Sequence, residues 1–420
     1  PISLISVFSK ILEKVIHIKL YSYLEQKGLL YPRQFGFRKN HNTEYGILDL
    51  LSNIRNAMEQ RLYTIGVFLD LAKAFDTVDH SILLKKMSLY GVSEKSATWF
   101  ENYLSGRTQY VDINGTSTTL LPISCGVPQG SILGPLLFLI YINDLSNCVP
   151  GLQVILFADD TNIFLSHKNI STLFSTMNAQ LKNLENWFHA NRLSINLTKT
   201  KYMVFGKERD TDNLPLKLPP LLLSSASIKR VYATKFLGIT LDENLSWTRH
   251  INILEANLSQ NVGVLAKVRK NLNSKAAKSL YFAFIHSYLS YGNIIWASTY
   301  KGKLSKLYNI QKRAVRIISS ADRLAHSRPI MAQHKVLNVF ELNIFQTLLF
   351  VYKHKQNTLP NVFRPKLSII KHRYSSRLAK HGYSEKSTIG KNRYGIEIRG
   401  PFLWNRLNCV EAKASTDPVK

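Results

Sequence analysis

The chain has 420 residues, 45% of them hydrophobic, so it is too long for one small domain and has the apolar content of two or three ordinary folded units. Its 55 Lys and Arg against 27 Asp and Glu give a formal net charge of +28, which favours a nucleic acid or an anionic membrane surface as a partner. The isolated Cys125, Cys148 and Cys409 lack the spacing of a disulfide framework or a zinc site, and fit a reducing compartment.

Both helices and strands are predicted in the first part of the chain. Helical spacing of apolar residues predicts helices over 8–25, 43–58, 80–90 and 170–188, and β-rich runs predict strands over 64–70, 109–113, 118–123, 154–158 and 162–165. The longest apolar run, 132–142, is too short to span a bilayer and contains Pro135, so we expect a buried helix. The polar, proline-bearing segment 209–220 is expected to be a loop.

Beyond residue 245 the pattern is helical, with helices predicted over 251–272, 276–289 and 304–318. Strands and helices followed by helices alone indicate an α+β unit followed by helical units. Residues 301–420 hold 24 basic and 6 acidic residues, a net charge of +18, which favours contact with a phosphate backbone. The aromatic residues of this region suit base stacking or a small core equally: Tyr374, Tyr383, Tyr394, Phe402 and Trp404.

Three carboxylates stand at the ends of predicted strands. Asp70 closes the apolar run 64–70, and Asp159 and Asp160 stand between the two strands 154–158 and 162–165. Adjacent carboxylates repel each other and buried ones are costly, so a divalent cation such as Mg²⁺ is their natural partner. Two such ions held by rigid strand ends are what nucleotidyl transfer requires. Taken alone, the acidic pair suits an ordinary hairpin turn equally well.

Other polar residues have simpler interpretations. Asp76 and Asp79 are expected to cap or precede the helix that begins near His80. The segment 124–135 contains glycines that allow close backbone approach, and Gln129, whose amide suits a base or a sugar. A helix that begins after this segment would favour phosphate at its N-terminus, although a plain turn before a helix has the same signature.

These segments, in this order, resemble the core motifs of reverse transcriptases, most closely those of non-LTR (LINE-type, Jockey-like) retrotransposons. The resemblance places the first metal-binding motif at 68–80, the substrate-binding motif at 126–131 and the second metal-binding motif at 157–160. It extends to fingers motifs at 1–4 and 34–38, to 196–200, to 236–239, and to helical segments at 291–296, 310–313 and 404–405. Nearly the whole chain is covered, most weakly after about residue 320.

The resemblance implies an α+β right-hand polymerase fold. Residues 1–245 would form the fingers and palm, an antiparallel sheet with helices, 246–325 a helical thumb and 326–420 a basic, mostly helical C-terminal region. It implies that Asp70, Asp159 and Asp160 hold two Mg²⁺ ions, with Mn²⁺ as a substitute. The remaining implied roles are nucleotide binding by Leu71, Phe75, Gln129, Gly130 and Arg38, general-acid chemistry by Lys199, and a primer grip at Phe236, Leu237 and Gly238. Phe75 would act as a steric gate against a 2′-hydroxyl, and Arg38 suits either a template or triphosphate contact or a structural one.

The implied function is RNA-directed DNA polymerisation, in which a DNA 3′-end is extended with dNTPs on an RNA template and no membrane is involved. The family usually has an Arg before the Pro-Ile-Ser of residues 1–3 and often an endonuclease domain further upstream, and neither is present in this sequence. An inactive remnant that only binds nucleic acid is therefore an alternative. An RNA-dependent RNA polymerase is a third possibility, which Phe75 disfavours. The nucleus is the location that the family suggests.

Overall fold

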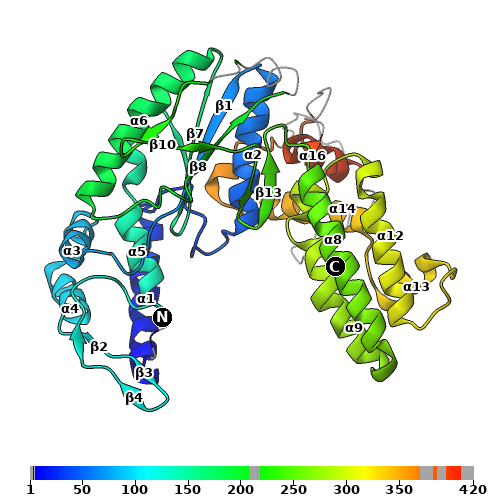
Figure 1. Cartoon of the computed structure of the whole chain (residues 1–420), viewed down its shortest axis with the longest axis horizontal. Helices are drawn as coiled ribbons and strands as arrows, with labels where there is room; N and C mark the ends of the chain where they lie inside the picture. The colour runs from blue at the N-terminus through cyan, green and yellow to red at the C-terminus, as the bar shows by residue number, and fades with distance from the viewer. Residues whose placement is uncertain are drawn as a thin grey trace. The chain divides into compact units, whose positions relative to one another are not determined.

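A five-stranded sheet and a set of helices organise the computed structural model, which describes residues 3, 5–207, 215, 218–368, 382–385 and 394–407 (Figure 1). The chain divides into two units, the first made of Pro1–Gly46 and Arg61–Val231 and the second of Ile47–Gln60 and Tyr232–Lys420. The three-part division predicted from the sequence, with boundaries at 245 and 325, stays a prediction. The N-terminal motif at 1–4 and the loop predicted at 209–220 lie largely outside the described residues.

The sheet of the first unit has the strand order β11-β8-β1-β7-β6. Its strands are β1 Tyr63–Leu69, β6 Gln153–Phe157, β7 Asp160–His167, β8 Lys201–Phe205 and β11 Lys229–Arg230. Neighbours pair in antiparallel fashion except for β11, which runs parallel to β8. The central strand β1 is apolar and buried along almost its whole length, as predicted for 64–70. Gly66 is required there, because a Cβ would lie 2.6 Å from the ring of Phe164 on β7.

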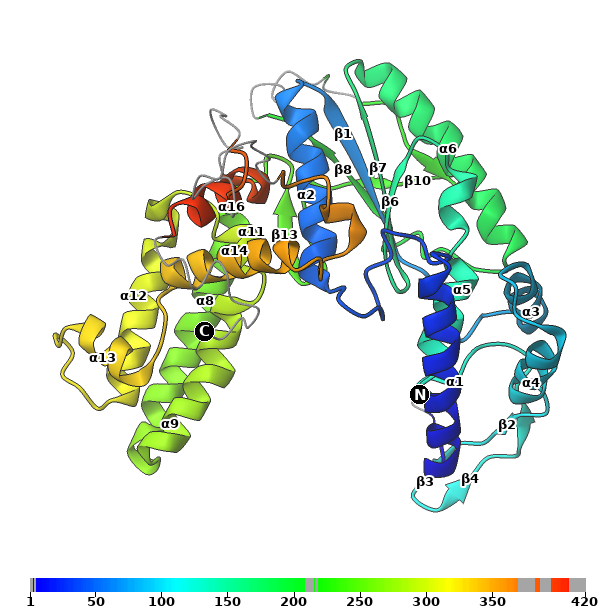
Figure 2. The same ribbon diagram turned by 180° about the vertical axis from the view of Figure 1, so that it is seen from behind.

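Helices supply the rest of the first unit's core. They are α1 Val7–Gln26, α3 His80–Leu89, α4 Glu94–Leu104, α5 Gly134–Ile142 and α6 Ile170–Ala190, with the short 3₁₀ helix η1 Leu145–Cys148. Every predicted helix is confirmed, and α4 is an addition. Helix α6 buries one apolar stripe against β1 and β7 and runs alongside the sheet in both views (Figures 1 and 2). The whole of α5 except Pro135 is buried, as expected from its apolar run.

Short strand pairs complete this unit. They are β2 Thr108–Gln109 with β5 Leu121–Pro122, β3 Asp112–Ile113 with β4 Thr116–Ser117, and β9 Leu222–Leu223 with β10 Ala226–Ser227. The first two pairs form one interrupted, exposed hairpin around Asn114 and Gly115, which both have positive φ. The predicted strands 109–113 and 118–123 are therefore present as shorter pieces.

The second unit is mainly helical. It contains α2 Thr43–Glu59 from residue 47 on, the hairpin β12 Ala233–Phe236 and β13 Ile239–Asp242, α8 Thr248–Val268, η2 Arg269–Asn271, α9 Ser274–Tyr281, the π-helical η3 Phe282–His286, α10 Ser287–Ser290, α11 Asn293–Trp296, α12 Lys301–Ile318, α13 Ser327–His334, α14 Val339–Lys355, η4 Asn361–Phe363 and α16 Ile396–Asn405. The helices predicted over 251–272, 276–289 and 304–318 are confirmed, the second of them in three pieces. In the ranges that the structure describes, no helix has the length and apolar content that crossing a bilayer requires.

Described residues of the basic C-terminal region contribute aromatic side chains to the core of the second unit. Tyr383 and Trp404 are almost fully buried and meet edge to face at 6.3 Å. Tyr394 packs against Tyr300, and Phe402 stays 44% exposed. Tyr374 lies outside the described residues. For Tyr383 and Trp404 the core interpretation is therefore correct, and base stacking is excluded by their burial.

Ionic contacts join this region to α2 within the second unit. The Nζ of Lys366 lies 2.7 Å from the carboxylate of Asp49, which is fully buried on α2. Ser52, one turn further along α2, donates a hydrogen bond to Glu397 of α16. Helix α2 is therefore held by residues more than three hundred positions later in the chain.

A buried glutamate ties α1 to the rest of the first unit. Glu13 is 2% exposed although the face of α1 around it is largely open to solvent. One carboxylate oxygen accepts a 2.8 Å hydrogen bond from the hydroxyl of Tyr103 on α4, and the other accepts a 2.6 Å bond from the N–H of Ile132. A single side chain thus pins α4 and the segment before α5 to α1.

Replacing Glu13 should destabilise the first unit. In Glu13→Ala the buried N–H of Ile132 and the hydroxyl of Tyr103 lose their acceptor, which should lower the free energy of unfolding by about 1–3 kcal/mol. Chemical denaturation followed by circular dichroism measures this loss. Glu101→Ala, at an exposed position of α4, is the matched control and should change stability by less than about 0.5 kcal/mol. Equal stabilities of the two variants would contradict the assignment.

Candidate active site

The pairing of β1 with β7 sets Asp70 against the acidic hairpin. In this antiparallel register Leu69 pairs with Thr161, so Asp70, the next residue, comes opposite Asp160. Asp160 itself pairs with Phe157 across the β6–β7 hairpin. The tip of that hairpin is therefore Ala158 and Asp159. The sequence-based turn at 159–161 was wrong by one residue, because Ala158 adopts a positive φ of 55° and lets the strand resume at Asp160.

Asp70 is close enough to influence the ionisation of the two hairpin carboxylates. Burial raises the pKa of Asp159, and the negative charge of Asp70 raises it further. Burial, together with the charges of Asp159 and Asp70, raises the pKa of Asp160 to about 6. Burial is the larger of these causes, and the mutual repulsion of the acidic side chains adds to it. Asp160 keeps an exposed surface beside the atoms that desolvate its carboxylate, and water there screens part of the repulsion.

Oxygen donors of this kind fit a hard divalent cation. Within the part of the chain that the structure describes, no three His, Cys, Asp or Glu side chains are arranged so that they could hold a metal ion together. Lys199 brings a positive charge to the site, with its Nζ 3.6 Å from Oδ2 of Asp70. Both side chains are substantially exposed, so this ion pair is weak and leaves the Asp70 carboxylate available to other ligands.

Lys199 reaches Asp70 because the segment after α6 runs beside the end of β1. The N–H of Ala72 donates to the carbonyl of Ser194 at 2.9 Å, and the N–H of Asn196 donates to the carbonyl of Asp70 at 2.8 Å. Leu71, between them, pairs with Ile195 in an isolated antiparallel bridge and is 7% exposed. The motif at 196–200 is thereby held at the carboxylates.

Phe75 lies in a small aromatic cluster. Its half-buried ring stacks on Phe138 of α5 at 4.6 Å and meets Phe37 edge to face at 6.3 Å. Its backbone carbonyl accepts a hydrogen bond from the N–H of Val127. The ring is therefore held in place from two sides, as a steric gate would need to be.

The predicted substrate-binding segment packs against the turn that follows β1. Gln129 donates from Nε2 to the Asp76 carboxylate at 3.0 Å, and Gly130 is exposed with φ 103°. Gly126 approaches the backbone of Asp76 so closely that a Cβ would lie 2.7 Å from its carbonyl oxygen. Asp79 caps α3 through a 3.0 Å bond from the N–H of Ile82, which confirms the capping role expected for it.

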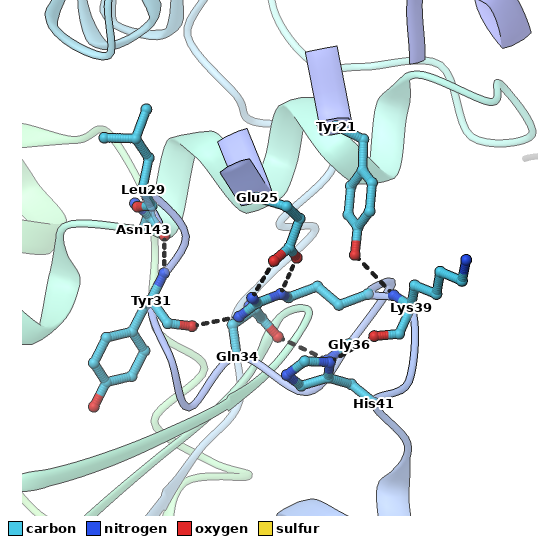
Figure 3. A network of polar contacts seen from close by, with 10 residues as sticks. Tyr21, Glu25, Leu29, Tyr31, Gln34, Gly36, Lys39, His41 and Asn143 are labelled. Carbon is cyan, nitrogen blue, oxygen red and sulfur yellow. Dashed lines mark hydrogen bonds and ion pairs between the residues drawn. The ribbon is translucent and has the colours of Figure 1, made fainter. Parts of the chain in front are cut away.

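Arg38 makes the structural contact that its motif allowed. The guanidinium side chain is 8% exposed and donates to both oxygens of Glu25, at 2.9 and 3.0 Å, and to the carbonyl of Tyr31 at 2.8 Å. Figure 3 shows the surrounding network, in which Glu25 and Tyr31 face this guanidinium. A template or triphosphate contact by Arg38 would have to break these bonds, and it stays a prediction.

The predicted primer grip belongs to the second unit. Phe236 ends β12, and Leu237 and Gly238, both with positive φ, form the two-residue turn to β13. The hydroxyl of Tyr291 donates to the Leu237 carbonyl at 2.6 Å, and a Cβ on Gly238 would lie 2.9 Å from the Tyr291 ring. Tyr291 was noticed only as part of a helical motif, and its contact with this turn could not be found from the sequence.

Comparison with known proteins identifies a family whose model matches this chain. Residues 1–241 match the family described as reverse transcriptase (RNA-dependent DNA polymerase). The RNA-directed DNA polymerase from mobile element jockey of Drosophila melanogaster is 28% identical over 377 residues, which cover 87% of this chain and 40% of that protein. The probable RNA-directed DNA polymerase from transposon X-element of the same species is 26% identical over 351 residues, covering 81% and 38%. The chain thus spans about two fifths of the length of these curated relatives.

Among solved structures, the apo telomerase from Candida tropicalis aligns with a TM-score of 0.42 and 14% identity, covering 80% of this chain and 55% of that one.

The raised pKa of Asp160 predicts a pH-dependent effect on stability. Its folded-state pKa of about 6 exceeds the ordinary value of 3.8, so the protonated carboxyl contributes stability at low pH that is lost as the pH rises through about 6. Asp160→Asn cannot ionise. It should therefore raise the melting temperature of the metal-free protein near pH 8 and leave it unchanged near pH 4, as scanning calorimetry in a chelating buffer would measure.

Asp322→Asn, in an exposed turn of the second unit, is the matched control and should show no such difference between the two pH values. A variant at Asp160 that is equally stable or less stable than the unmodified chain near pH 8 would contradict the raised pKa of Asp160.

Proposed function

The chain belongs to the reverse transcriptase (RNA-dependent DNA polymerase) family, and from this premise we propose that it extends a DNA 3′-end on an RNA template, as the polymerase part of a non-LTR retrotransposon protein. The observation that carries the proposal is the register that sets Asp70 opposite Asp160 beside the hairpin tip of Asp159. A sheet that brings three acidic side chains from separate strand ends together suits two-metal nucleotidyl transfer. The relatives' printed names support the same activity.

In this proposal Asp70, Asp159 and Asp160 hold two Mg²⁺ ions, for which Mn²⁺ can substitute, with the Leu71 carbonyl as a further ligand. When bound, such ions activate the primer hydroxyl and neutralise the charge of the leaving pyrophosphate. The carboxylates must be ionised to bind them, which the pKa of about 6 at Asp160 allows at neutral pH and above. Lys199, whose Nζ lies 3.6 Å from Oδ2 of Asp70, would give a proton from Nζ to the leaving group.

Neighbouring residues would select and orient the nucleotide. The ring of Phe75, fixed against Phe138, would stand under the sugar and exclude a 2′-hydroxyl. Gln129 and Gly130 would contact the incoming dNTP from a segment that is pinned to Asp76. These roles come from the family resemblance. The stacking of Phe75 on Phe138 and the hydrogen bond from Gln129 to Asp76 hold the two side chains in place, which supports the roles.

The nucleic-acid partners follow from charge and from the resemblance. An RNA template and a DNA primer would contact the chain through its excess of Lys and Arg, which gives a net charge of +28. The turn Phe236–Gly238, buttressed by Tyr291, would hold the primer end.

Primer extension on an RNA template is the direct test. The chain with Mg²⁺ and dNTPs should extend a DNA primer, and Asp159→Ala should reduce the rate by more than about a hundredfold, because even residues that only support metal ligands cost 10–100-fold. Asp322→Ala is the matched control and should retain the rate. Salt-sensitive RNA binding without incorporation would instead favour a protein that only binds nucleic acid.

Sugar selection gives an independent test. Phe75→Ala removes the ring that would meet a 2′-hydroxyl, so the ratio of kcat/KM for rNTPs to that for dNTPs should rise by at least about tenfold. Steady-state kinetics with matched dNTP and rNTP pairs measures this ratio. Phe8→Ala, which removes a ring that is 85% exposed on α1, should leave the ratio unchanged. An unchanged ratio in Phe75→Ala would remove the steric gate from the proposal.

A further inference from the structure

The free edge of β6 is covered by residues 31–36, here called the edge segment. β6 is the last strand of the sheet, and a strand in that place has one row of backbone groups without a strand partner. The edge segment supplies three bonds along it: the Tyr31 hydroxyl donates to the Val154 carbonyl, the N–H of Leu156 donates to the Arg33 carbonyl, and the N–H of Phe35 donates to the Leu156 carbonyl. The segment thus follows β6 towards the catalytic hairpin.

Gln34 continues this series with its side chain. Its Oε1 accepts hydrogen bonds from the N–H of Gly36 at 2.9 Å and from the N–H of Ala158, at the hairpin tip, at 3.1 Å. The residue is 2% exposed, and its Nε2 has no partner among the residues that the structure describes. Burying a carboxamide costs free energy unless the group is hydrogen-bonded. The two hydrogen bonds that Oε1 accepts offset this cost.

Gly36 allows the edge segment to come this close. A Cβ at Gly36 would lie 2.4 Å from the backbone nitrogen of Ala158 and 3.0 Å from the carbonyl carbon of Phe157. Any side chain there would push the hairpin away from Gln34. Gln34 therefore supplies a hydrogen-bond acceptor for the backbone of the hairpin tip, and Gly36 leaves the space that this backbone occupies.

The hairpin tip needs such support because Ala158 has φ 55°, the left-handed conformation that residues with a Cβ disfavour. Ala158 immediately precedes Asp159 and Asp160, so its conformation sets the direction in which both acidic residues leave the strand. Glycine would adopt it without strain, but this chain has alanine. The N–H of that alanine donates to Oε1 of Gln34, which holds the residue in place.

The edge segment is itself anchored away from the hairpin. The guanidinium of Arg38 joins its Tyr31 carbonyl to Glu25 of α1, and the N–H of Tyr31 donates to Asn143 at 2.7 Å (Figure 3). The edge segment is therefore held by α1 and by Asn143 at the end of α5, independently of its contacts with the hairpin.

We infer that Gln34 is a positioning residue, which holds Ala158 in the left-handed conformation and so fixes the aim of Asp159 and Asp160. The effect of Gln34 on the polymerisation rate rests on the proposed polymerase function. The support that Gln34 gives to the backbone of Ala158 does not. Gln34 acts through the backbone of Ala158, while the acidic side chains bind the metal ions.

The test combines two substitutions. Gln34→Met keeps the size of the side chain and removes its acceptor, and Gln34→Asn keeps the amide but shortens its reach, so at least one folded variant should be obtained. Each is made in the Ala158 background and in Ala158→Gly, where the left-handed conformation carries no side-chain strain. Gln180→Met, which replaces a glutamine of α6 whose Oε1 has no partner in the described part of the chain, is the matched control.

Two readouts separate positioning from general stability. Hydrogen exchange of the amide at 158, measured by NMR, should accelerate at least about tenfold in Gln34→Met, because that amide loses its acceptor. Primer extension should slow by about tenfold or more in the Ala158 background and by clearly less in Ala158→Gly. The control should change neither readout.

Two results would overturn the inference. One is unchanged exchange at position 158, which decides the matter even if the unmodified chain incorporates no nucleotide and the proposed function fails. The other, in an active chain, is an equal loss of rate in the alanine and glycine backgrounds, which is the result expected if Gln34 only stabilises the fold.

Discussion

The site depends on the register between β1 and β7. Because side chains alternate across a strand, a slip of one residue would turn Asp70 away from Asp160 and exchange the two buried faces of β1. Burial on both sides of β1 prevents that slip, and the close fit of Gly66 against Phe164 marks the register at its centre. The hydrophobic core therefore determines where the acidic groups meet.

Gathering acidic groups has an energetic cost that the surroundings limit. The raised pKa values of Asp159 and Asp160 show that the fold disfavours their ionised forms when no metal is bound. Lys199 offsets part of the charge at Asp70, and the open side of the site lets water screen the rest. The left-handed Ala158 adds backbone strain at the same place. Such local costs are common where a fold is arranged for binding, and here the edge segment and the buried sheet offset them.

Much of the fold could be predicted because its signals are local. The strand that ends at Asp70, the long helix α6 and the capping of α3 by Asp79 all follow from periodicity or from a single side chain. The hairpin tip was misplaced by one residue, because Asp is the commoner turn residue and nothing in the sequence marks Ala158 as left-handed. Helix α4 was overlooked, although its buried residues Phe100 and Leu104 stand one helical turn apart and its sequence is amphipathic.

Other parts of the site could not be predicted, since they depend on contacts between distant positions. Gln34 and Ala158 are 124 residues apart in sequence, and the edge segment shows only as a short fingers motif. The pairing of Arg38 with Glu25, and of Asp49 on α2 with Lys366, likewise depends on the folded chain. The neighbours of a charged residue in the folded chain decide which of two roles it plays. These neighbours cannot be identified from the sequence alone.

The central claim is that Asp70 and the Asp159–Asp160 pair share divalent cations. Anomalous diffraction at the manganese edge, from crystals of this chain equilibrated with Mn²⁺ and a template–primer, tests it most directly. The account predicts manganese peaks within coordination distance, about 2.2 Å, of carboxylate oxygens from Asp70 and from at least one of the two hairpin aspartates. Manganese bound elsewhere, with Asp70 still paired to Lys199 and no peak at its carboxylate, would contradict it.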